Sequence, residues 1–122
     1  MAAADLDTAQ EFQSAAEVAM LTGDFEAVMA LVAPDVEVVT PLHSLEGVDA
    51  LTEELSRARP ADSTHVEFEH GDWKVLRNGR YFSEVRVLFK KETGELSYSR
   101  DRSFELTIQD GKVTRYEMRL AG

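Results

Sequence analysis

"YFSEVRVLFKKETGELSYSRDRSFEL", residues 81–106, decides the fold because it predicts two long strands joined by a tight turn. Its centre, Thr93-Gly94, is typical of a two-residue hairpin turn. Such a turn sets the pairs Val87–Arg100, Val85–Arg102, Ser83–Phe104 and Tyr81–Leu106. A slip of one residue would turn every side chain to the opposite face, so this register defines one shared inner face. That face is mainly apolar but carries two arginines, Arg100 and Arg102.

Two more turns extend the hairpin into an antiparallel meander. At Asn78-Gly79 we expect a three-residue loop that sets Val75 opposite Tyr81 and turns Trp73 inward. At Asp110-Gly111 we also expect a three-residue loop, with the glycine in a left-handed conformation. This second loop sets the pairs Phe104–Tyr116 and Arg102–Met118.

The strand that precedes Trp73 needs a bulge. The residues of this strand that we place on the inner face have the opposite parity from Trp73: Val66, Phe68 and His70. An extra residue near Gly71-Asp72 would bring both sets to one face, and a glycine inside a strand often marks a bulge. The bulge predicts a bent sheet with a hollow on its concave side, which is a usual place for a small-molecule site.

Upstream of the strands, the sequence predicts three helices. They begin near Thr8, Asp24 and Val48, and end at Gly23, near Pro34 and before Pro60. Thr8 and Glu11 have the spacing of a capping box, and a residue before proline resists the helical conformation. Between the second and third helices, Val36, Val38 and Thr40 form one face of a short strand. Helices followed by an antiparallel meander indicate an α+β domain with three helices packed on a curved antiparallel sheet.

Composition limits the possible functions. The chain has 23 acidic and 13 basic residues, a net charge of −10, which disfavours nucleic acid and anionic membranes as partners. It has no cysteine, no apolar run long enough for a membrane span and no recognisable export signal, so we expect a cytoplasmic protein. We expect residues 1–7 to be disordered and residues 8–122 to form a single domain.

Two stretches resemble the NTF2-like superfamily, in particular its SnoaL-like and ketosteroid-isomerase-like branch. They are "LTGDFEAVMALVAPDVEVVTP", residues 21–41, and "FELTIQDGKVTRYEMRL", residues 104–120. The resemblance covers nearly the whole chain. It implies a cone-shaped α+β fold, a ligand cavity inside the cone and a homodimer formed through the sheet.

The same resemblance argues against steroid isomerisation. The isomerases of this superfamily use an aspartate as general base, with a tyrosine and a protonated aspartic acid as oxyanion hole. The corresponding positions in this chain are Thr40, Ala16 and either Arg102 or Ser103. All the isomerase catalytic residues are therefore missing. The sequence predicts a SnoaL-like domain that binds a small, largely apolar ligand, including apolar anions.

An acid–base enzyme of the isomerase, cyclase or hydratase type, acting on a polyketide-like or other apolar substrate, is the alternative. In that case His70 would be the catalytic base, because histidine titrates near neutral pH. Arg100 and Arg102 would stabilise a developing anion, unless they pair with carboxylates of the protein itself.

Further candidate ligand-binding residues come from the turn after the short strand that ends at Thr40, and from the inner face of the sheet. They are Thr40, His43, Trp73, Tyr98, Tyr116 and Met118. Aromatic walls suit flat apolar ligands, although such residues also build ordinary cores. His65 and His70 are five residues apart on a strand, which is a poor spacing for metal ligands, so we expect neither a metal nor another cofactor.

Overall fold

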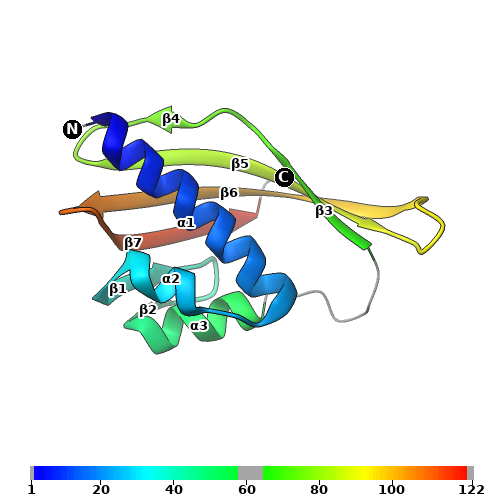
Figure 1. The fold of residues 1–122 in the computed structure, drawn as a ribbon, viewed down its shortest axis with the longest axis horizontal. Coiled ribbons are helices and arrows are strands. Elements are labelled where there is room, and N and C mark those ends of the chain that lie inside the picture. The colour runs from blue at the N-terminus through cyan, green and yellow to red at the C-terminus, as the bar shows by residue number, and fades with distance from the viewer. Residues whose placement is uncertain (1, 58–64, 121–122) are drawn as a thin grey trace.

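The computed structural model describes residues 2–57 and 65–120, in which it has three helices and seven strands (Figure 1). The helices are α1 (Ala2–Thr22), α2 (Glu26–Leu31) and α3 (Val48–Arg57). The strands are β1 (Val32–Val39), β2 (Ser44–Glu46), β3 (His65–His70), β4 (Lys74–Val75), β5 (Arg80–Lys90), β6 (Leu96–Gln109) and β7 (Lys112–Leu120). The α+β class is confirmed. Of these helices, none is both long and apolar enough to cross a membrane.

The strands form one sheet in the order β2-β1-β7-β6-β5-β3, with β4 also paired to β5. The expectation of a purely antiparallel sheet is corrected, because β1 runs parallel to β7, with Val38 opposite Tyr116. Parallel neighbours need a long connection, and here α3 and the whole meander lie between these two strands in the sequence. The sheet is therefore mixed, and its first and last long strands are neighbours.

Helix α1 begins earlier than the sequence predicts. It starts at Ala2, so Thr8 lies inside the helix and the expected capping box is wrong. Residues 2–7, for which we expected disorder, are helical, and Leu6 packs against the core. Alanine has the highest helix propensity, so the alanine-rich start extends a helix that packing of later turns already stabilises.

The β5–β6 pairs have the predicted register from Arg80 to Phe89, but the two-residue turn that we expected is wrong: the Lys91 amide donates a hydrogen bond to the Glu95 carbonyl around a loop of residues 92–94, and a bulge between Phe89 and Lys90 compensates for the longer loop. Val85 lies opposite Arg102, and Tyr81 lies opposite Leu106.

The bulge near Gly71 is also confirmed. His70 pairs with Val85 and Lys74 pairs with Phe82, so four residue steps on one side lie opposite three steps on β5. The amide of Gly71 donates a hydrogen bond of 2.8 Å to the Glu84 carbonyl, which holds the bulge against β5.

The register between β6 and β7 differs from the prediction. Phe104 lies opposite Met118 and Leu106 opposite Tyr116, two residues away from the pairs that we expected. Asp110 and Gly111 both have positive φ, 52° and 74°, which allows a two-residue turn that matches the strand twist. The extra residue is placed in a bulge of β7 rather than in the loop. Because the shift is an even number of residues, Tyr116 and Met118 still face the expected side, whereas before the bulge Val113 takes the inner position opposite Ile108 that the predicted register gave to Lys112.

The core lies between the helices and the concave face of the sheet. Phe12 of α1, Leu51 of α3 and Leu106 of β6 are almost fully buried there. Figure 1 shows α1 crossing the sheet diagonally, while the β5–β6 hairpin and β3 extend beyond the helices. The part of the hairpin next to its turn is therefore not covered by a helix.

The convex face of the sheet carries charged ladders, as the alternation predicts. Glu117 accepts hydrogen bonds from Arg115 and Arg119 at 2.7 and 2.6 Å. Burial acts to raise the pKa of Glu117, but the two arginines hold it below its usual value. Ion pairs of this kind on an exposed face contribute little stability individually. The stability of the fold therefore depends mainly on the concave side.

A pair of alanine variants tests the turn geometry. Gly79 and Gly94 both have positive φ, 71° and 90°, but a Cβ atom on Gly79 would lie 2.7 Å from the Ile108 carbonyl oxygen, whereas one on Gly94 would meet nothing within 4 Å. Gly94→Ala should lower the free energy of unfolding by about 1–2 kcal/mol, the cost of a left-handed alanine. Gly79→Ala should cost about 1–3 kcal/mol more because of the clash. Urea unfolding measures both, and equal losses would contradict the structure.

Candidate functional site

A pocket lies between α1 and the concave face of the sheet. Its walls are mostly apolar, with Phe12 and Met20 from α1 on one side and Phe68, Trp73 and Leu106 on the other. The cavity volume is about 30 Å³, which is enough for about two water molecules. In this conformation the pocket is narrow, so a larger ligand needs movement of the partly buried side chains.

Arg102 of β6 lines this mostly apolar pocket and also borders the open hollow beside His70 and Asp101. Arg102 is only 9% exposed, and its Nε atom has no hydrogen-bond partner. None of the ion pairs among the described residues includes it. Burial lowers the pKa of Arg102, while the nearby Tyr116 and Glu54 act in the opposite direction. A buried guanidinium without a carboxylate partner is costly, and an anionic group in the pocket would compensate for this cost.

Gln13 of α1 supplies a second unpartnered donor. Its Nε2 atom is buried without a hydrogen-bond partner, and the residue lines the same pocket as Arg102. An amide nitrogen carries two N–H donors and no acceptor. Together, the two side chains offer donors and no matching protein acceptor, which is the complement of an oxygen atom on a ligand.

Glu17 places a carboxyl group in the pocket, one helical turn after Gln13. Its Oε2 atom lies 2.6 Å from Nε2 of His70, and the ionised carboxylate accepts the hydrogen bond. Burial raises the pKa of Glu17, and the hydrogen bond and charge of His70 partly offset this effect. His70 itself is 43% exposed at the rim and does not line the pocket. Of this pair Glu17 lines the pocket and His70 does not, so the role of His70 as a base stays a prediction.

Trp73 and Tyr116 line the pocket, where the sequence placed them. The ring of Tyr116 lies 5.9 Å from that of Phe12 and 5.8 Å from that of Phe104, between centroids. Burial raises the pKa of Tyr116 well above its usual value, so its hydroxyl stays protonated at neutral pH. Trp73 is the single tryptophan of the chain, which makes its fluorescence a specific probe of this pocket.

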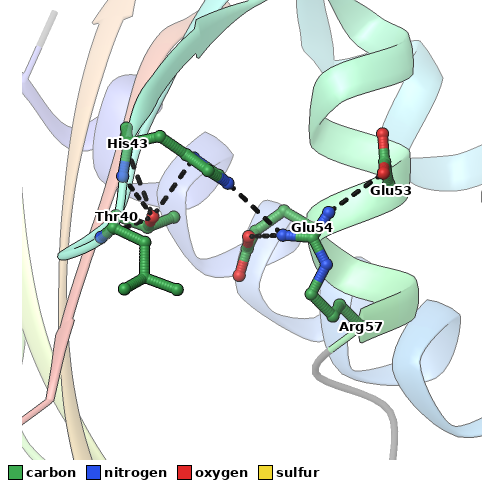
Figure 2. Close-up of polar contacts among 6 residues, drawn as sticks. Thr40, His43, Glu53, Glu54 and Arg57 are labelled. Atoms are coloured by element: carbon green, nitrogen blue, oxygen red, sulfur yellow. Dashed lines mark hydrogen bonds and ion pairs between the residues drawn. The ribbon is translucent and has the colours of Figure 1, made fainter.

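Thr40 and His43 lie in the turn between β1 and β2, away from the pocket. The Thr40 amide donates to the His43 carbonyl at 2.9 Å, which closes the turn. Figure 2 shows how the turn connects to α3: His43 Nδ1 lies 3.4 Å from the Thr40 hydroxyl and its Nε2 lies 3.4 Å from Nη1 of Arg57. Arg57 in turn pairs with Glu53 at 3.0 Å and Glu54 at 3.4 Å. This elbow therefore fixes α3 against the sheet and does not contribute to the lining of the pocket.

Three other candidate residues do not line the pocket: Tyr98, Arg100 and Met118. Arg100 has the predicted inner-face register, but it is exposed because the hairpin extends beyond the helices (Figure 1). Tyr98 is 51% exposed and stacks on Phe89 with centroids 4.4 Å apart. Met118 is buried in the core. Of the two arginines, Arg102 lines the pocket and Arg100 does not, so a ligand-binding role for Arg100 stays a prediction.

Sequence reasoning missed Gln13 and Glu17. A signal was present, because these residues flank the apolar positions Phe12, Ala16 and Met20 and so lie at the edge of the buried stripe of α1. Among residues 2–57 and 65–120, no three His, Asp or Glu side chains are grouped closely enough to hold a metal ion.

Solved structures with the same architecture define the class of this fold. An NTF2-like protein from Anabaena variabilis has a TM-score of 0.79 at 13% identity, over 98% of this chain and 90% of that chain. An NTF2-like protein of unknown function from Exiguobacterium sp. 255-15 has a TM-score of 0.71 at 14% identity, over 93% and 98%. TerC, co-crystallized with polyporic acid, has a TM-score of 0.70 at 17% identity, over 97% and 92%. These likenesses define an NTF2-like fold.

The family is more specific than the fold. The family model of the SnoaL-like domain matches residues 12–116, which include every residue named above as lining the pocket. This chain belongs to the SnoaL-like domain family. No curated protein sequence matches it.

Replacing Arg102 tests whether its burial is costly. Arg102→Met keeps much of the side-chain volume and removes the unpartnered donor, so the free energy of unfolding should rise by about 1–3 kcal/mol. Arg100→Met, at an exposed position of the same strand, should change it by less than about 0.5 kcal/mol. Urea unfolding of the two variants measures the difference. A clear loss of stability in Arg102→Met would contradict an uncompensated guanidinium.

Proposed function

We propose that this protein binds a small, largely apolar anion in the pocket beneath α1. The observation that carries the proposal is the buried Nε of Arg102, which has no hydrogen-bond partner and belongs to a residue lining a mostly apolar pocket. A carboxylate or enolate oxygen bound there would satisfy this donor, and Gln13 Nε2 would supply a second hydrogen bond. The apolar remainder of the ligand would pack against aromatic side chains such as Phe68 and Trp73.

The narrowness of the pocket adds a requirement. An aromatic or aliphatic acid needs more space than about 30 Å³, so Phe68 or Trp73, both only partly buried, would move outward when it binds. The environment of the tryptophan would then change. The fold neighbour TerC, co-crystallized with polyporic acid, supports small-molecule binding by this architecture.

Fluorescence of Trp73 tests the proposal directly. Phenylacetate and octanoate should change the emission of the wild-type protein in a saturable manner, and their neutral amides should bind more weakly. Arg102→Met should raise the Kd of the acids at least about tenfold, because a hydrogen bond to a charged group contributes about 1.5–3 kcal/mol. Arg100→Met is the matched control and should leave the Kd unchanged. If the acids and amides bind alike, or the two variants respond alike, Arg102 does not bind an anion.

Acid–base catalysis is the second candidate function, and the position of Glu17 favours it. Glu17 replaces His70 as the base, with His70 as the group that positions it. The carboxylate of Glu17 would take a proton from a carbon next to a carbonyl group, and the electron pair would move to the carbonyl oxygen. The Nε–H of Arg102 would stabilise that oxygen, and Glu17 would return the proton to the same or another carbon.

Deuterium uptake tests this second function without knowledge of the natural substrate. In D2O, phenylacetone should exchange its acidic C–H protons faster with the wild-type protein than with Glu17→Gln, as measured by NMR. The rate should increase with pH as the carboxyl ionises, and because burial raises the pKa of Glu17, this increase should occur above the usual range of a glutamate. Glu11→Gln, on the exposed side of α1, is the control. Equal rates with both variants would exclude Glu17 as the base.

A further inference from the structure

The lining of the pocket includes polar side chains that do not neutralise each other. Two of them carry unpartnered donors, the nitrogens of Arg102 and Gln13. The third is Glu17, whose carboxyl group forms its ion pair with His70 and not with Arg102. Glu17 and Arg102 both line the pocket, but no ion pair within 4.0 Å joins them. The guanidinium of Arg102 therefore has no carboxylate of the described residues within ion-pair distance, although Glu17 lines the same pocket.

Glu17 retains capacity to accept a hydrogen bond. Its Oε2 atom is occupied by His70 Nε2, whereas no hydrogen bond from a described residue reaches Oε1. A carboxylate can accept several hydrogen bonds, so His70 satisfies only part of this group. A simple apolar anion at Arg102 would donate no hydrogen bond to Oε1. It would also place its own negative charge in the same pocket as this carboxylate.

Resting on the proposed function, we infer that the ligand is a hydroxy acid: an apolar monoanion whose charged group binds Arg102 and Gln13, and whose separate hydroxyl group donates to Glu17. The hydroxyl is neutral, which suits a carboxylate that already has His70 beside it. Such a molecule would supply an acceptor to Arg102 and Gln13 and a donor to Glu17. A plain acid would supply only the acceptor, so the pocket should bind the two kinds of acid with different affinity.

The expected discrimination follows from the type of hydrogen bond. A neutral donor on a buried carboxylate forms a charge-assisted hydrogen bond, and a site built for such a bond rejects ligands that lack the donor. We expect at least about a tenfold difference in Kd, which corresponds to about 1.4 kcal/mol. The position of the hydroxyl group on the ligand determines which isomer binds more tightly.

Calorimetric titration with phenylacetate and its 2-, 3- and 4-hydroxy derivatives tests the inference. At least one hydroxy isomer should bind the wild-type protein about tenfold more tightly than phenylacetate. Glu17→Met should abolish this advantage while leaving the affinity for phenylacetate equal or higher. Glu17→Gln, which keeps a neutral acceptor, should retain part of it. Glu11→Gln, on the exposed side of the same helix, should behave as wild type.

The outcomes distinguish the hydroxy-acid inference from the proposed binding of an anion. If phenylacetate binds through Arg102 but no hydroxy isomer binds more tightly, the hydroxy-acid inference is overturned and the proposed function stands. If the advantage of a hydroxy isomer survives in Glu17→Met, the hydroxyl does not contact Glu17 and the inference is overturned as well. If none of the four acids binds the wild-type protein, the proposed function fails together with the inference.

Discussion

The alternation of side chains along β6 determines what the site can be. Leu106 and Ile108 are buried beneath the helices, and a strand places every second residue on the same face. Arg102 has the same parity, so burial of the apolar end of the strand forces a guanidinium onto the concave face as well. Further along the strand, Arg100 has this parity too, but the helices do not cover it. The charge in the pocket is therefore a consequence of strand geometry combined with the position of α1.

This arrangement places stability and binding in opposition. The concave side supplies the apolar burial on which the fold depends, yet the same side contains donors without partners, Arg102 Nε and Gln13 Nε2. Native proteins rarely leave buried polar groups unsatisfied, and such groups in a pocket are expected where a ligand completes them. The carboxyl of Glu17 adds to this cost, since burial raises its pKa despite the hydrogen bond from His70.

Local rules account for the parts of the molecule that the sequence predicted well. The register of the β5–β6 pairs and the bulge at Gly71 follow from apolar alternation and turn residues, which act over a few neighbours. The predicted β6–β7 pairs were wrong because the extra residue lies in a bulge of β7 and not in the loop. Both arrangements place Tyr116 and Met118 on the inner face, so alternation along the sequence does not distinguish them. Arg102 was found from its register. Glu17 was missed because the edge of a buried helical stripe resembles the solvent-facing side until the curvature of the sheet is known.

The division of polar groups between α1 and β6 affects how such a protein can change over time. Gln13 and Glu17 are one turn apart on a helix that forms no ladder with the sheet, whereas Arg102 lies in a strand that is paired on both sides. Substitutions at the two helix positions can alter ligand preference without disturbing any strand register. The strand, by contrast, can keep a constant anchor for one charged group. Descendants of this chain could therefore diversify their ligands through a single helix face and preserve the same scaffold.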